Sequence, residues 1–72
     1  MMRIDDERVE AELVGCKGLA PRMLVRKSAV AEGRLKIRYG AAHEHFRLDH
    51  YRDVGGTSVP VFVWTDRTWI AE

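Results

Sequence analysis

The chain has 72 residues, of which 46% are hydrophobic and 32% are charged, and its formal net charge is +1. These values predict one small folded domain over residues 1–72, with flexibility expected only in residues 1–8, and they exclude a disordered chain. The length also excludes a separate nucleotide-binding domain and a barrel enzyme of roughly 250 residues. A chain of this size buries only about 60% of the surface of its unfolded state, so its core must be thin.

The single cysteine, Cys16, excludes an internal disulfide framework. A small domain without disulfides is expected in a reducing compartment, so we expect a cytoplasmic protein. The first seven residues are too acidic for a signal peptide. No apolar run approaches the ~18 residues that a membrane span requires, so no membrane association is expected.

Apolar and polar residues alternate along most of the chain, which predicts strands rather than helices. We expect strands over residues 9–13, 22–27, 34–39, 43–51 and 59–71. Connections that contain glycine or proline separate them, over residues 15–21, 31–33, 40–42 and 53–58. A short helix is the alternative for residues 9–13, because Val9 and Leu13 are also four residues apart.

These elements predict an all-β fold, with five or six antiparallel strands in a meander that curls into a half-barrel or remains an open sheet. One set of apolar side chains would face the interior of this sheet. The expected core residues are Leu13, Val25, Leu35, Ile37, Phe46, Leu48, Phe62, Trp64 and Ile70.

The last segment is apolar on both faces if it forms one regular strand. Phe62, Trp64 and Ile70 would share one face, and the other would carry Val59, Val61, Val63 and Trp69. Strands that are apolar on both faces are buried on both faces, and so short a chain has little with which to cover the second. An exposed apolar row marks an interface, so we expect a homodimer.

Basic residues are concentrated in the middle of the sequence. Nine of the 12 Lys and Arg residues lie within residues 13–52, and both ends of the chain are acidic. The acidic start is expected to fold back on the basic centre or to meet it in a second subunit. Arg34, Lys36 and Arg38 alternate along one strand and form a candidate binding face, which would be larger if residues 22–27 paired with this strand. Such a face suits phosphate groups, but a net charge of +1 is low for a nucleic-acid-binding domain.

Glu44 and His45 are the candidates for acid–base catalysis, with Arg67 as a third candidate, because histidine is the side chain that titrates near neutrality. Neighbouring residues on a strand point to opposite faces, so Glu44 and His45 would not pair directly. The preferred interpretation is a structural polar network of His45, Arg67 and Glu72 that fixes the register of two strands.

His43, His45 and Asp49 form the densest group of residues able to bind a metal, and two histidines with a carboxylate would suit iron, manganese or zinc. Arg47 would share their face, however, and would repel a cation. We therefore expect no bound metal and no other cofactor.

The C-terminal part of the chain carries a recognisable pattern. It consists of Glu44-His45-Phe46, then Val59-Pro60-Val61-Phe62-Val63-Trp64-Thr65, then Arg67-Thr68 and the ending Ile70-Ala71-Glu72. This pattern resembles a family of small actinobacterial proteins of unknown function, with a Glu-His-Phe motif and a Pro-Val-Tyr-x-Trp-Thr-x-Arg-Thr-x-Ile-Ala-Glu ending. Val63 and Trp69 stand where that family often has arginine. The resemblance covers residues 13–72 and implies no activity, but some members look like accessory genes of natural-product clusters.

The leading hypothesis is a small non-enzymatic accessory or binding protein that acts as a homodimer, in the biosynthetic context that the resemblance implies. Its partner would be a protein or a small molecule. The residues expected to contact it are Trp64, Trp69, Arg34, Lys36 and Arg38. The second hypothesis is a cofactor-free acid–base enzyme of secondary metabolism that uses Glu44 and His45. The third is nucleic-acid binding through the basic strand face.

Overall fold

A computed structural model describes residues 7–70, and it consists of one five-stranded sheet and one short helix. The predicted all-β fold with an open, curled sheet is therefore confirmed. The expected flexibility of residues 1–8 falls largely outside the described residues. In chain order the elements are β1 (Arg8–Val14), β2 (Arg22–Arg26), α1 (Lys27–Glu32), β3 (Arg34–Tyr39), β4 (Ala42–Val54) and β5 (Thr57–Trp69).

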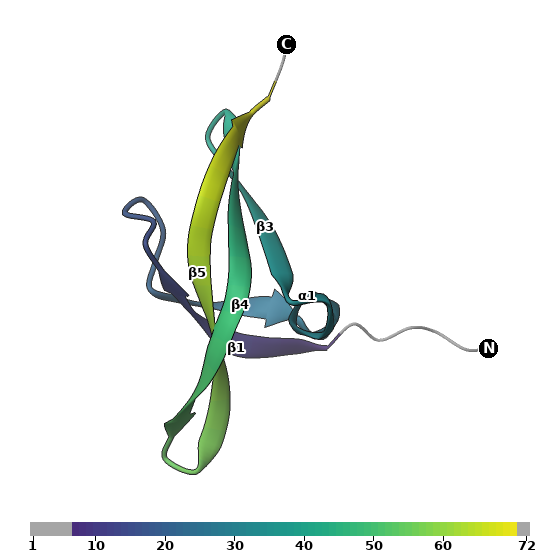
Figure 1. Cartoon of the computed structure of the whole chain (residues 1–72), viewed down its shortest axis with the longest axis vertical. Coiled ribbons are helices and arrows are strands. Elements are labelled where there is room, and N and C mark those ends of the chain that lie inside the picture. Colours follow the sequence, from purple (N-terminus) through teal and green to yellow (C-terminus); the bar gives the residue numbers. More distant parts are fainter. Residues whose placement is uncertain (1–6, 71–72) are drawn as a thin grey trace, which may run out of the picture.

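The strands lie in the order β2-β1-β5-β4-β3, so the last strand in the sequence is the central strand of the sheet (Figure 1). Strand β1 is parallel to β5, and every other neighbouring pair is antiparallel. The expectation of a wholly antiparallel meander is thus wrong at one pairing. Parallel neighbours need a long connection between them, and here β2, α1, β3 and β4 together provide it. The arrangement leaves β2 and β3 as the two edges.

A helix that the sequence analysis missed joins the two edge strands. Residues 31–33 were expected to form only a turn, but α1 extends over six residues and ends at Gly33. Gly33 has a left-handed φ of 77°, and its N–H donates to the carbonyl oxygens of Ala29 and Val30. This is the glycine cap that terminates many helices. Six residues are too few to show a helical apolar pattern, which is why alternation alone did not reveal the helix.

Strands β4 and β5 form a hairpin of two 13-residue strands whose lower end projects beyond β1 (Figure 1). Its turn consists of Gly55 and Gly56, with φ values of 58° and 86°, where the sequence had indicated a connection over residues 53–58. Two residues with positive φ are what a tight two-residue hairpin turn requires. The pairing shifts register between His45 and Phe46 and again between Leu48 and His50.

The first register shift changes which side chains share a face of β5. Phe46 pairs with Trp64, whereas His45 pairs with Asp66, so Thr65 is an extra residue between them. Such a bulge reverses the alternation that follows it. Trp69, opposite Ala42, therefore lies on the same face as Trp64, and the predicted placement of Trp69 beside the valines is wrong.

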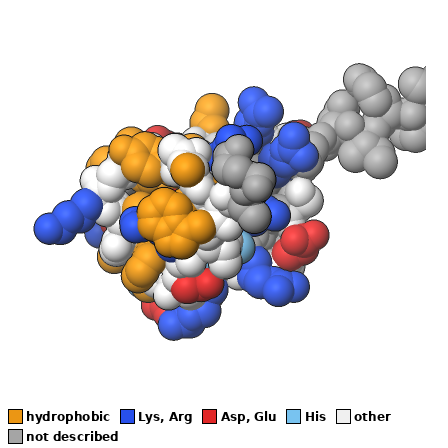
Figure 2. All heavy atoms as spheres, turned by 90° about the horizontal axis from the view of Figure 1, so that it is seen from above, with side chains coloured by type: hydrophobic (Ala, Val, Ile, Leu, Met, Phe, Trp, Pro, Cys, Tyr) orange, Lys and Arg blue, Asp and Glu red, His pale blue; other side chains and the backbone are white. Residues whose placement is uncertain are grey.

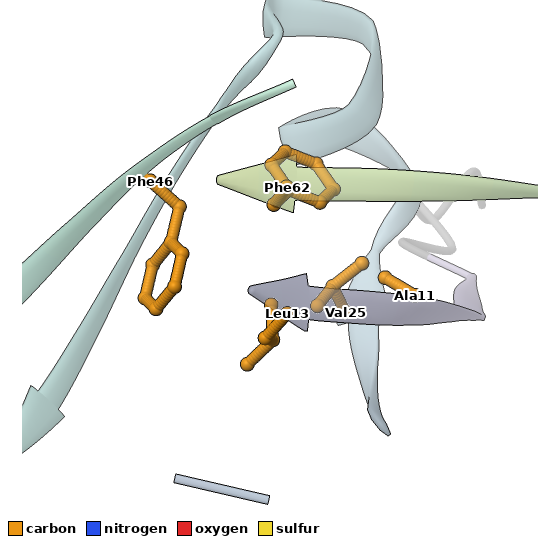
Figure 3. Packing of buried hydrophobic residues seen from close by; sticks show 5 residues of the cluster. All are labelled: Ala11, Leu13, Val25, Phe46 and Phe62. Atoms are coloured by element: carbon orange, nitrogen blue, oxygen red, sulfur yellow. The ribbon is translucent and has the colours of Figure 1, made fainter. Parts of the chain in front are cut away.

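The core lies on the concave face of the curled sheet, where Leu13, Val25, Phe46 and Phe62 are buried as predicted (Figure 3). Ala11 is also buried there, although it was not among the expected core residues. The remaining predicted core residues are only half-buried: Leu35, Ile37, Leu48, Trp64 and Ile70. A thin core of this kind is what the length of the chain implied.

The second face of β5 is covered within the same chain. Val59 and Val61 are only 5% and 2% exposed, so the predicted exposed row of valines is wrong. Glu12 on β1 and Arg52 on β4 form an ion pair of 3.0 Å, and these strands flank β5 on either side. Glu12 pairs with Val61 and Arg52 with Val59, so the ion pair spans the valine face of β5. Long charged side chains can cover apolar surface with their methylene groups in this way.

The two edge strands are linked at both ends of the curled sheet. Helix α1 connects the edge strands at one end, and the loop after β1 contacts β3 at the other. A Cβ atom placed on Gly18 would lie 2.6 Å from the ring of Tyr39, so glycine is needed where this loop meets β3. The edges of the sheet thus face a common hollow without pairing with each other.

We expect Phe62→Ala to lower the free energy of unfolding by about 3–5 kcal/mol, because Phe62 is fully buried on the central strand. Urea unfolding followed by circular dichroism would measure the loss. Tyr51→Ala is the matched control, since Tyr51 is 53% exposed on the projecting hairpin and its loss should stay within about 0.5 kcal/mol. Equal losses for the two variants would contradict this assignment of the core.

Candidate functional site

Glu44 is the one buried charged side chain within the described residues, with an exposure of 1%. Its Oε1 accepts a hydrogen bond from the indole Nε1 of Trp64 at 2.8 Å, and its Oε2 accepts one from Nε of Arg67, also at 2.8 Å. The pairing of β4 with β5 places Arg67 directly opposite Glu44. A buried carboxylate costs several kcal/mol unless it is paired and hydrogen-bonded, and here both oxygens have a donor.

Arg67 links this buried carboxylate to the surface. Its guanidinium lies 5.5 Å from the centre of the Trp69 ring, and Trp69 itself is 70% exposed. A cavity of about 240 Å³ lies beside these groups and is also lined by Tyr39 and Ala42. Figure 2 shows hydrophobic side chains gathered at this end of the molecule, with Lys and Arg side chains around them. The cavity is small and opens beside a carboxylate that is already engaged.

His45 belongs to the opposite face of the sheet from Glu44. It pairs with Lys36 and Asp66 on the neighbouring strands, and its Nε2 lies 2.7 Å from the hydroxyl of Thr68. The structure therefore does not bring Glu44 and His45 together. Arg67 binds Glu44 and not His45, so the expected network of His45, Arg67 and Glu72 does not form as predicted. Glu72 lies outside the described residues.

The three candidate metal ligands do not converge. His43 pairs with Arg38 and Thr68, and Asp49 lies at the second register shift of β4. Asp49 accepts a hydrogen bond from Nδ1 of His50 at 2.8 Å, and this bond, with the charges of His50 and Arg47, lowers the pKa of the Asp49 carboxyl. Among residues 7–70, no three His, Cys, Asp or Glu side chains lie close enough together to hold a metal ion.

A hollow with a volume of about 1000 Å³ lies between the edge strands β2 and β3. Its walls include residues 23–26 of β2 and residues 34–37 of β3, together with parts of α1, β4 and β5. Apolar side chains line it, and cationic ones outnumber anionic ones. The charged residues are Arg8, Arg26, Arg34, Lys36 and Arg47 against Glu32 and Asp66.

This hollow contains only part of the binding site that the sequence predicted. Arg34 and Lys36 line it, whereas Arg38 does not, and neither do Trp64 and Trp69. Strands β2 and β3 do not pair, so the larger basic sheet face considered from the sequence is wrong. The curl of the sheet nevertheless brings both strands to one hollow. It places Arg26 near Arg34, as the sequence analysis considered, and it adds Arg8 and Arg47, which no sequence pattern linked to Arg34.

One family of proteins matches most of the chain. A model of a family of unknown function, DUF5988, matches residues 5–72, so the chain belongs to that family. No curated protein and no solved structure matches it significantly. Over the described part of the chain, no helix is long and apolar enough to cross a membrane.

We expect Trp64→Phe to lower the free energy of unfolding by about 1–3 kcal/mol, because it removes the donor to a fully buried carboxylate oxygen but keeps an aromatic ring. Thermal unfolding would measure the change. Trp69→Phe is the control, since Trp69 is largely exposed and a phenyl ring still presents a face to Arg67. A larger loss for Trp69→Phe than for Trp64→Phe would show that the Glu44 network is not the stabilising element.

Proposed function

We propose that this chain is a small non-enzymatic accessory protein of the cytoplasm, which acts as a homodimer and binds a partner in the hollow between β2 and β3. The observation that carries this proposal is the lining of the hollow. It combines apolar side chains with five cationic and two anionic residues, and it is far larger than the cavity beside Glu44. Apolar walls with a few placed charges are typical of binding sites.

The engagement of Glu44 argues against the acid–base enzyme. A general base must come within hydrogen-bond distance of a substrate proton, but the Glu44 side chain is only 1% exposed, and Trp64 and Arg67 hold its two oxygens. His45 lines the large hollow, but it belongs to the other face of the sheet from Glu44. These contacts support a structural role for Glu44, and the short distance between Nε2 of His45 and the hydroxyl of Thr68 supports a structural role for His45 as well.

The hollow is also poorly suited to single-stranded nucleic acid. Proteins of that class add stacking aromatic rings to their cationic surfaces. Apart from His45, the aromatic side chain of the lining is Phe46, which is 2% exposed and cannot stack with a base.

The homodimer needs a different surface from the one that the sequence suggested. Val59 and Val61 are covered within the chain, but other large apolar side chains remain outside. Leu24 on the edge strand β2 is 62% exposed, and Trp69 at the end of β5 is 70% exposed. In so small a protein these side chains are the best candidates for contact with a second copy.

The family resemblance suggests a biosynthetic context, and the structure suggests why the family motif contains these residues. We propose that small relatives from actinobacteria share the Glu-His-Phe motif and the Trp-containing ending because these segments supply Glu44, Trp64 and Arg67. These three residues form one hydrogen-bonded unit that joins β4 to β5. An association with natural-product biosynthesis rests on the resemblance alone.

The proposal predicts different outcomes for two variants at the native gene. Replacing the native gene with an Arg34→Glu, Lys36→Glu variant should reproduce the metabolite profile of a deletion strain, because the hollow loses two of its five cations and gains two carboxylates. His45→Gln should match the wild type, since glutamine can still hydrogen-bond to Thr68. The reverse result, measured by mass spectrometry of culture extracts, would favour the acid–base enzyme.

Sedimentation equilibrium at micromolar concentration should give about twice the 8.3 kDa mass of one chain. Leu24→Glu and Trp69→Glu are the variants to compare, because both side chains are exposed and a charge there should leave the fold intact. At least one should shift the protein to monomer, with Tyr51→Glu as an exposed control on the hairpin. A wild-type protein that is monomeric across the whole concentration series would refute the homodimer.

A further inference from the structure

Two walls of the hollow are formed by the edge strands of the sheet. Strands β2 and β3 end the sheet on either side, and each has one hydrogen-bonded neighbour among the described strands. Four consecutive residues of each strand line the hollow, so residues from both faces of each strand border it. An exposed edge offers a row of N–H and C=O groups that can pair with another extended chain.

Strand β3 presents a strictly alternating pattern along this edge. Leu35 and Ile37 are half-buried against the core, whereas Arg34 and Lys36 alternate with them and are exposed. Because residues opposite each other in paired strands share a face, an added strand would place alternate side chains beside the cations and beside the apolar residues. The complementary sequence alternates acidic and apolar residues.

One pair of strands within the chain already combines an acidic strand with a basic one. Strand β1 alternates glutamates with apolar residues and pairs with β2, whose ends carry arginines. Oε2 of Glu10 on β1 lies 3.8 Å from Nη1 of Arg22 on β2. An acidic, alternating strand is therefore the neighbour that the basic edge strand β2 accepts. On β3, by contrast, Arg34 and Lys36 lie opposite Arg47 and His45 of β4, so within this strand pair they have no carboxylate opposite them.

We propose that β3 binds an extended acidic segment of a partner protein as an added strand, with its carboxylates beside Arg34 and Lys36 and its apolar side chains against Leu35 and Ile37. This inference rests on the proposed binding function and names the chemistry of the partner. Strand addition combines main-chain hydrogen bonds, which provide affinity, with alternate side-chain contacts, which provide specificity. The volume of about 1000 Å³ beside the edge provides room for the segment.

The probe is a fluorescein-labelled ten-residue peptide in which glutamate and valine alternate, titrated with the full-length protein and followed by fluorescence anisotropy. We expect saturable binding. A peptide with five glutamates followed by five valines has the same charge and composition, and it should bind at least about tenfold more weakly because its side chains cannot match the alternation of β3. Alternating lysine and valine should not bind.

Two N-methylated forms of the probe test the main-chain hydrogen bonds. Successive N–H groups of a strand point to opposite edges, so methylation of the glutamate amides and of the valine amides blocks different edges. Addition to one strand edge predicts that one of the two forms loses binding by at least about tenfold while the other retains it. Equal binding of both forms would refute strand addition.

Lys36→Glu and Lys17→Glu are matched protein variants, since both residues are exposed and only Lys36 lines the hollow. Lys36→Glu should weaken binding of the alternating peptide by at least about threefold, because a like charge replaces an opposite one across the strand pair. Lys17→Glu changes the net charge equally and should have little effect. Unfolding curves of both variants would establish that each is folded.

Three further outcomes would overturn the proposal: no binding of the alternating peptide, equal binding of the block peptide, or competition by a 20-nucleotide oligothymidylate at similar concentration. The last would assign the hollow to nucleic acid. These failures are distinguishable from failure of the proposed function, because the gene-replacement experiment tests Arg34 and Lys36 without any assumption about the form of the partner.

Discussion

The structure depends on burying both faces of β5. This strand is apolar on its two sides, it is central in the sheet, and the chain is too short to supply a second layer. The curl of the sheet encloses Phe62 on the concave side, and the Glu12–Arg52 ion pair spans the valines on the convex side. An ion pair on a surface contributes little by its charge, so its main effect here is to hold two long side chains over Val59 and Val61.

The Glu44 network has a related effect at the other end of the hairpin. The bulge at Thr65 turns Trp64, Arg67 and Trp69 to one face, and two of these side chains then meet the carboxylate of Glu44. A shift of one residue in the pairing would move all of them to the opposite face. The buried carboxylate would then lose both donors, so the network penalises any other register of β4 against β5.

Alternation in the sequence predicted the strands well, because each has a polar and an apolar side, and β3 was predicted with the bounds that the structure shows. It could not predict the position of Thr65 as a bulge, which reverses the face of Trp69, or the parallel pairing of β1 with β5. Both depend on contacts between distant segments. Glu44 and Arg67 were recognised as candidates, but their direct pairing required the shifted register.

The hollow also results from the shortness of the chain. A sheet that curls far enough to cover its own core, yet has too few strands to close, must leave two edges facing each other across a gap. In this protein the edges are short and carry Arg22, Arg26, Arg34 and Lys36, a feature that in other sheets prevents uncontrolled pairing. Charge that repels a basic strand, and that loses hydration beside a neutral one, also selects an acidic strand. Protection of the edge and recognition by the edge therefore require the same residues, and a small domain can acquire a specific binding surface without adding an element to its fold.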